Sequence, residues 1–83
     1  MKLLDVVATL NPIPTEQLSL VKSEYASIEY LPRGQVGTIV EIYEDGSEAY
    51  YLIEFSDRQG QEYAMATLKE DEIIVLHYEL QIA

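Results

Sequence analysis

The sequence predicts a small, mostly β domain, and three observations support this. Runs rich in Val, Ile, Tyr and Thr recur along the chain, as is typical of strands. Asp45-Gly46 separates two of these runs, and such a pair favours a β-hairpin because glycine adopts positive φ without steric cost. The chain has 83 residues and shows no linker or repeat, so a single domain spanning residues 1–83 is expected.

The first strand is expected at Asp5–Leu10, which ends at a segment containing two prolines. The residues that follow, 15–31, are predicted to form an insert or lid. Leu18, Val21 and Tyr25 recur at helical spacing and favour a short helix in the first half of this insert. The second half alternates and equally permits extended chain. We expect the insert to be dispensable for folding, because lengthening a loop costs little free energy.

The rest of the chain predicts a meander with tight turns. Tyr51, Ile53 and Phe55 share one face of their strand by alternation, which directs them toward a core. The short charged stretch 69–72 predicts a 3₁₀ turn. Further strands are expected at 36–43, 49–55, 62–68 and 73–78, and the expected core comprises Val6, Val40, Ile53, Phe55, Leu68 and Val75.

This layout has one long excursion after the first strand and a 3₁₀ turn before the last. It predicts a small five-stranded SH3-like barrel with an inserted short helix or lid after the first strand. Gly37 lies inside a predicted strand, where a glycine is expected to mark a bulge or a sharp corner.

Composition argues against several classes of function. Five basic against fifteen acidic residues give a formal net charge of −10, so no nucleic acid is expected as a partner. The chain has no cysteine, and His77 is its one histidine, so we expect no catalytic residues, no metal ligands and no cofactor. No apolar run approaches the roughly 20 residues that cross a bilayer, so a cytoplasmic protein without membrane contact is predicted.

The seven tyrosines are the feature most open to a functional interpretation, because tyrosine combines a large contact area with a hydrogen-bonding tip. Alternation assigns Tyr51 to the core and leaves Tyr50 on the opposite face. Any one tyrosine is more often structural than part of a binding site. The predicted partner-binding residues are Tyr25, Tyr30, Arg33, Tyr43 and Tyr50.

Several segments resemble a family of small bacterial proteins known as domain of unknown function 4926 (DUF4926). They are Gly34–Glu41, Glu54–Asp57, Tyr63–Ala64, Thr67–Leu68, Leu4–Ala8 and Ile74–Leu76. The chain departs from that family between Pro12 and Pro32, where its members have a shorter loop. The element Val36–Val40 is also similar to the second strand of KOW-type and nitrile-hydratase β-subunit-like barrels. The resemblance implies an SH3-like fold, supplies no catalytic residues, and points to accessory or toxin-neutralising proteins.

Three hypotheses of function follow. The first is a non-catalytic protein-interaction module, binding a protein partner or further copies of the same chain through its insert and tyrosines. The second is an acidic antitoxin or immunity-type protein that neutralises a basic toxin, since opposite potentials speed association. The third, a nucleic-acid-associated KOW-like domain, is disfavoured because the basic residues are scattered.

Overall fold

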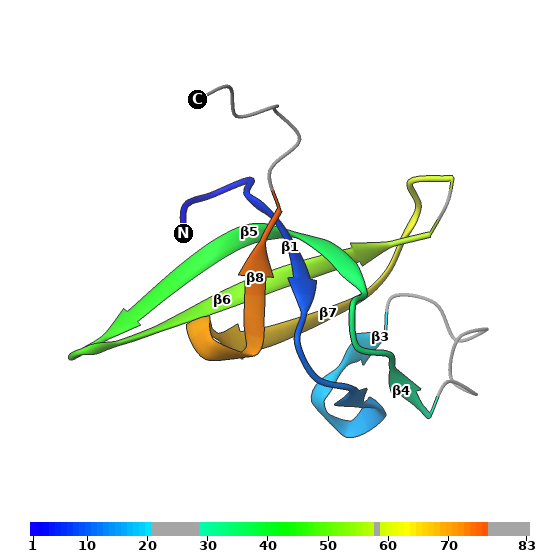
Figure 1. Cartoon of the computed structure of the whole chain (residues 1–83), viewed down its shortest axis with the longest axis horizontal. Coiled ribbons are helices and arrows are strands. Elements are labelled where there is room, and N and C mark those ends of the chain that lie inside the picture. Colours follow the sequence, from blue (N-terminus) through cyan, green and yellow to red (C-terminus); the bar gives the residue numbers. More distant parts are fainter. Residues whose placement is uncertain (21–28, 58, 77–83) are drawn as a thin grey trace, which may run out of the picture.

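The computed structural model describes residues 1–20, 29–57 and 59–76, which form a mostly β fold. The strands are β1 Val6–Thr9, β2 Ile13–Pro14, β3 Ser19–Leu20, β4 Tyr30–Leu31, β5 Val36–Asp45, β6 Glu48–Ser56, β7 Glu62–Lys69 and β8 Ile73–Val75. Six of them form an antiparallel sheet in the order β3-β7-β6-β5-β1-β8, and β2 and β4 form a small second sheet (Figure 1). This part of the chain contains no helix with the length and apolarity needed to span a membrane.

The hairpin of β5 and β6 confirms the prediction made from Asp45-Gly46. Asp45 is the partner of Glu48, so the connection is a turn of only two residues, Gly46 and Ser47. Gly46 adopts a φ of +64°, the left-handed conformation that glycine accepts most readily. The short turn fixes the register of both strands, and therefore the face on which each side chain lies.

The core lies on one face of the large sheet. The predicted core residues Ile53, Phe55 and Leu68 are buried, and Val75 packs against them as a half-buried neighbour. Val6 and Val40 were expected there too, but both are only half-buried. The core cluster consists of Val7, Ile13, Leu31, Ile39, Tyr51, Ile53, Phe55, Tyr63, Ala64, Ala66, Leu68 and Ile73.

The two errors in the predicted core have simple physical causes. Val7 is fully buried, and successive side chains of a strand point to opposite faces, so Val6 lies on the face away from the core. The register between β5 and β6 shifts at Val40, which is a β-bulge. The bulge turns Val40 partly out of the core.

Gly37 pairs in register with Phe55, so the first of the two predicted alternatives, a bulge, is not found at this position, and a close approach of two strands requires the glycine. A Cβ atom at Gly37 would lie 2.6 Å from Cγ2 of Ile53 and 2.9 Å from Cδ1 of Phe55. Only a residue without a side chain lets β5 pass this close to the core side chains of β6.

The predicted five-stranded barrel is wrong, because the sheet is open. β3 pairs with one edge of β7, through Ser19 opposite Met65 and Leu20 opposite Ala64. After β7 the turn η3, Glu70–Glu72, carries the chain to β8 at the far edge of the sheet, beside β1. The two edge strands, β3 and β8, do not pair with each other, so the sheet does not close. The 3₁₀ turn itself confirms the prediction for 69–72.

The predicted helix is also wrong for the part of the insert that the structure describes. Thr15–Gln17 form a single 3₁₀ turn, η1, and β3 follows at once. Leu18 and Leu20 lie two residues apart in extended chain and both pack against the core, so their burial reflects alternation rather than helical spacing. Residues 21–28, including Tyr25, lie outside the described residues.

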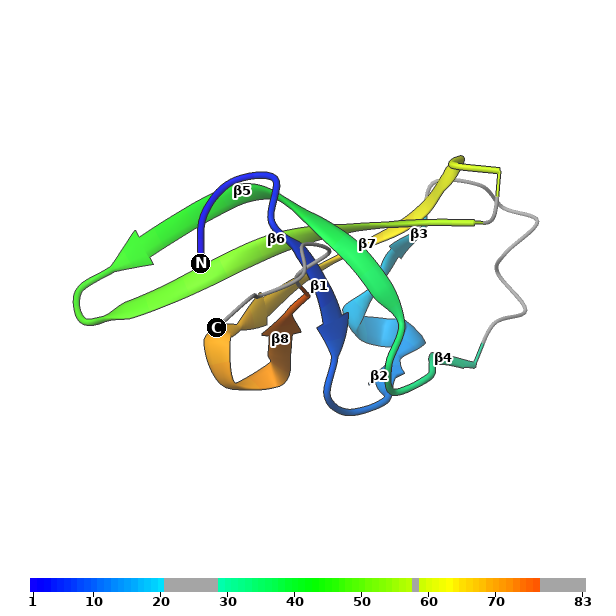
Figure 2. The same cartoon turned by 45° about the horizontal axis from the view of Figure 1, so that its top comes forward.

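Leu31, the last residue of the insert, is part of the core, which argues against the prediction that the insert is dispensable for folding. Ile13 of β2 and Leu31 of β4 are paired, and each is 2% exposed. Both belong to the same core cluster as Phe55. The small sheet therefore covers one end of the core (Figure 2), and removing it would expose that end to water.

Candidate functional site

A row of three side chains crosses the hairpin end of the large sheet. Tyr43 of β5 is the partner of Tyr50 of β6, and Tyr50 is the partner of Lys69 of β7. Residues directly opposite one another in an antiparallel sheet point to the same face. We call Tyr43, Tyr50 and Lys69 the tyrosine row; it lies on the face opposite the core. Tyr43 is 46% exposed, and Tyr50, in the middle, is half-buried.

Tyr50 is held in place by both its ring and its hydroxyl group. The hydroxyl donates a hydrogen bond to Oε2 of Glu48 at 2.6 Å. Nζ of Lys69 lies 5.8 Å from the centroid of the ring, within the range of a cation–π contact. The hydrogen bond to Glu48, followed by the negative charge of that carboxylate, raises the pKa of Tyr50 above its ordinary value. Tyr50 is therefore a neutral phenol that donates to a carboxylate.

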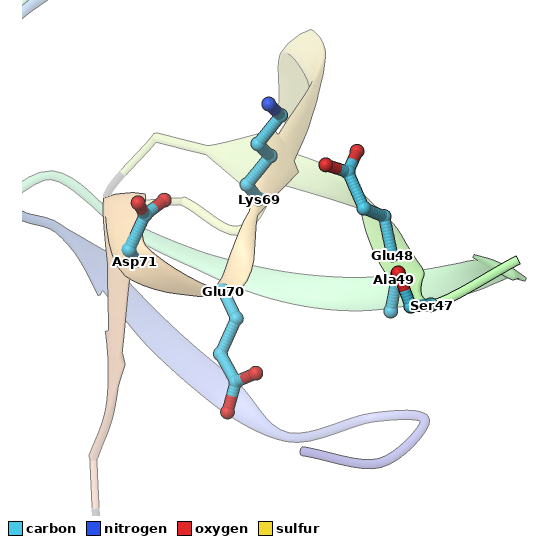
Figure 3. A pocket seen from close by; sticks show the side chains of 6 residues that line it. All are labelled: Ser47, Glu48, Ala49, Lys69, Glu70 and Asp71. Atoms are coloured by element: carbon cyan, nitrogen blue, oxygen red, sulfur yellow. The ribbon is translucent and has the colours of Figure 1, made fainter. Parts of the chain in front are cut away.

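An open cleft of about 390 Å³ lies beside this row, lined by Ser47, Glu48, Ala49, Lys69, Glu70 and Asp71 (Figure 3). The hairpin supplies one wall, and the end of β7 with η3 supplies the other. Oε1 of Glu72 accepts a hydrogen bond from the backbone N–H of Lys69 at 3.0 Å, which fixes the start of the 3₁₀ turn. The side chains of Lys69 and Glu48 extend toward the same side, whereas Glu70 points away from them (Figure 3).

The residues that line this cleft suit the recognition of a cationic group. Three of the six lining residues carry carboxylates, and all three are exposed to water. Exposed carboxylates beside aromatic rings attract cationic groups, above all guanidinium, which can both pair with a carboxylate and stack on a ring. Within the described ranges, no three His, Cys, Asp or Glu side chains are grouped as metal ligands would be. His77 lies outside the described residues.

The predicted partner-binding residues do not form one surface. Tyr43 and Tyr50 lie on the β5–β6 hairpin, whereas Tyr30 lies on β4 at the other end of the molecule (Figures 1 and 2). Tyr30 is 54% exposed, and Arg33 is exposed in the loop after β4. Tyr25 is outside the described residues. The four predicted residues that the structure describes thus divide between two ends of the molecule.

The loop that carries Arg33 is fixed to β1 by one buried threonine. Thr9 is 2% exposed, and its hydroxyl donates to the backbone oxygen of Pro32 at 2.9 Å. The hydroxyl oxygen of Thr9 in turn accepts a hydrogen bond from the backbone N–H of Gln35 at 3.0 Å. A buried hydroxyl with both roles satisfied stabilises the loop it joins. Arg33 therefore projects from a fixed loop, remote from the tyrosine row.

A second pair of carboxylates lies on the same face of the sheet. Glu54 of β6 and Glu62 of β7 are both half-buried. Loss of hydration on burial raises the pKa of Glu62. The negative charge of Glu54 adds to this shift, as does a hydrogen bond between the two groups in which protonated Glu62 is the donor.

Sequence reasoning assigned none of the residues that line the cleft to a binding site; they are Ser47, Glu48, Ala49, Lys69, Glu70 and Asp71. One signal was available. A two-residue turn at Gly46 and Ser47 dictates that Tyr43 faces Tyr50, because the strands pair outward from it. The position of Lys69 depends on the register between β6 and β7, which the longer connection after Ser56 does not fix.

The family comparison agrees with the resemblance seen in the sequence. The family described as a domain of unknown function (DUF4926) matches residues 3–75, and the chain belongs to this family. The match covers both edge strands of the large sheet and the tyrosine row. No match was found among curated proteins or among solved structures.

Proposed function

We propose that this protein is a non-catalytic protein-interaction module that binds a basic segment of a partner through the tyrosine row and the adjoining cleft. The observation behind the proposal is the ladder of Tyr43, Tyr50 and Lys69 across three strands, bordered by the carboxylate of Glu48. Tyrosines fixed on a sheet lose little conformational entropy on binding, which makes them effective contact residues.

Charge supports a basic partner. The chain carries a net charge of −10, and Glu48, Glu70 and Asp71 line the cleft. Lys69 already lies over the ring of Tyr50, so an incoming guanidinium would meet Tyr43, the more exposed ring of the row. An Arg side chain of the partner would stack there and pair with a nearby carboxylate.

The same charge supports a second candidate, an acidic antitoxin or immunity-type protein that neutralises a basic toxin. That role would use the same surface and differ in the partner alone. Our proposal includes no enzyme activity, no cofactor and no nucleic acid, and it places the protein in the cytoplasm.

The fold proposed for this module is an open relative of the SH3-like barrel. The order β8-β1-β5-β6-β7, with a 3₁₀ turn before the last strand, is the order of an SH3-like meander. The observed sheet adds β3 at one edge and lacks closure. KOW-type domains would share this strand order, which supports a common architecture rather than a common ligand.

The test is a titration of the full chain with a short Arg-rich peptide, in which binding is monitored through the NMR chemical shifts of the backbone amides. We expect the shifts to gather at Tyr43, Tyr50 and Lys69. Tyr43→Ala should weaken binding by at least about fivefold, since truncating an aromatic residue at the centre of an interface costs more than about 1 kcal/mol. The matched control is Tyr30→Ala, which removes an equally exposed tyrosine at the other end of the sheet. Equal losses in the two variants would contradict the proposal.

A further inference from the structure

The edge strand β8 presents an uncharged surface in a strongly acidic protein. β1, β8 and residues 36–40 of β5 contain no charged residue, although the chain has fifteen Asp and Glu. On the face away from the core, Val36, Ala8 and Ile74 lie side by side across these three strands. We call them the edge row. Val36 is 44% exposed and Ile74 is 51% exposed.

Most of the exposed apolar side chains lie on these strands or next to them in the sequence. Eight large apolar side chains are exposed among the described residues, and six of them lie on β8, on residues 36–40 of β5 or on the segments that flank β1 in the sequence. These six are Met1, Leu3, Leu4, Leu10, Val36 and Ile74. Apolar side chains concentrated on one part of a surface mark a contact site.

The backbone of β8 also has hydrogen-bonding groups directed away from the sheet. The N–H of Leu76 donates to the oxygen of Val6 at 2.8 Å, and the N–H of Leu10 donates to the oxygen of Glu72 at 2.9 Å. Even-numbered residues of this segment therefore bond to β1, so Ile73 and Val75 direct their backbone groups to the outer edge. Within the described ranges, no strand lies against that edge.

The pattern of groups on this edge is self-complementary. The N–H of Ile73 is already bonded to the oxygen of Glu70, which leaves the oxygen of Ile73 as acceptor and the N–H of Val75 as donor. A two-fold axis at Ile74 would place each Val75 N–H opposite the Ile73 oxygen of the other copy. It would also bring the two Ile74 side chains together as a non-hydrogen-bonded pair, the closer of the two antiparallel arrangements.

We propose that two copies of this chain associate through β8, in antiparallel register about Ile74, to form one continuous sheet across the dimer. Charge explains why two copies would meet at this edge rather than at another part of their surface. Two chains of −10 repel each other wherever carboxylates meet, and the edge row is where they are absent. β8 also lacks the Pro and Lys residues that protect edge strands from pairing. Because β8 has only three residues, apolar contact of the edge row supplements the two backbone hydrogen bonds.

The first test is sedimentation of the full chain over a range of concentrations. The wild type should rise from 9.5 kDa toward twice that mass. Ile74→Arg should raise the dimer dissociation constant at least about tenfold, because it sets like charges opposite each other at the axis. The matched control is Thr67→Arg, an exposed position on β7, which should leave the constant within about twofold of wild type.

The second test does not depend on a variant folding correctly. Hydrogen exchange of the Val75 amide in the wild type should slow as protein concentration increases. Three results would each overturn the proposal. They are a monomer at all concentrations, equal effects of Ile74→Arg and Thr67→Arg on the dissociation constant, and an exchange rate of the Val75 amide that does not depend on protein concentration. Tyr43→Ala should leave self-association unchanged, so failure of this proposal and failure of the basic-peptide site can be told apart.

Discussion

The hairpin end of the sheet and its β8 edge differ in the chemistry that they present to solvent. The hairpin end combines Tyr43 and Tyr50 with the carboxylates of Glu48, Glu70 and Asp71. The β8 edge presents Val36 and Ile74, and β1, β8 and residues 36–40 of β5 contain no charged residue. Charged rims speed encounter and select partners, whereas apolar edges supply contact area. A small chain can therefore keep two contacts separate by assigning each to its own part of one sheet.

Both regions depend on a common core, and the largest predicted effect tests that dependence. Phe55→Ala should lower the free energy of unfolding by about 3–5 kcal/mol, because Phe55 is fully buried in the core cluster. Chemical denaturation measures it, and Tyr43→Ala is the exposed aromatic control. A Phe55→Ala variant with wild-type stability would mean that the assigned core is wrong.

Leu31→Ala tests whether the small β2–β4 sheet belongs to the core that supports both regions. Leu31 is 2% exposed, so its truncation should cost about 2–4 kcal/mol. The neighbouring exposed position gives the control, Tyr30→Ala, which we expect to change stability by less than about 0.5 kcal/mol. If the two variants melt alike, the insert is a separate lid after all.

Gly37→Ala tests how closely β5, the strand shared by the two regions, packs against β6. The added methyl group would approach Cγ2 of Ile53 to 2.6 Å, so the core must shift to admit it. We expect a loss of about 1–3 kcal/mol, measured by thermal or chemical unfolding. Gly34→Ala does not serve as a control, because Gly34 has a φ of +86° and would be strained for another reason. An unchanged stability for Gly37→Ala would show that β5 does not pass so close to β6.

The smallest effect concerns pH. The folded state raises the pKa of Glu62, so it binds that proton more tightly than the unfolded chain, and the ionised carboxylate is destabilising above the raised pKa. Glu62→Gln should therefore be more stable than wild type at neutral pH. The difference should shrink as pH falls through the raised pKa.

Denaturation curves at several pH values measure this difference. Glu16→Gln is the matched control, since it makes the same change at an exposed side chain of η1. The same pH-dependent gain in both variants would show that the proximity of Glu54 and Glu62 is not its cause.

Local signals in the sequence predicted part of this structure. The Asp45-Gly46 pair fixes a hairpin because its geometry is set by neighbouring residues, and alternation correctly placed Tyr51, Ile53 and Phe55 inward. Closure of the sheet depends instead on which edge each distant strand joins. Nothing local to Ser19–Leu20 specifies pairing with β7. Apolar residues that recur two to four positions apart fit either a helix or a short strand.

The candidate sites divide in the same way. Tyr43 and Tyr50 were both predicted, and the short turn between them determines that they are adjacent. Their separation from Tyr30 and Arg33 could not be predicted, because it depends on the course of the whole sheet between them. The edge row, too, consists of residues from three strands that are distant in sequence.

The dependence of both contacts on salt tests whether one chain carries two separate contact surfaces, one acidic and one uncharged. Added salt shortens the screening length, to about 8 Å at physiological ionic strength. Self-association of two chains of −10 should therefore strengthen with salt, while binding of the Arg-rich peptide weakens. Sedimentation and peptide titration of the same full chain over one salt series give both trends. Two contacts that weaken together as salt rises would contradict the account.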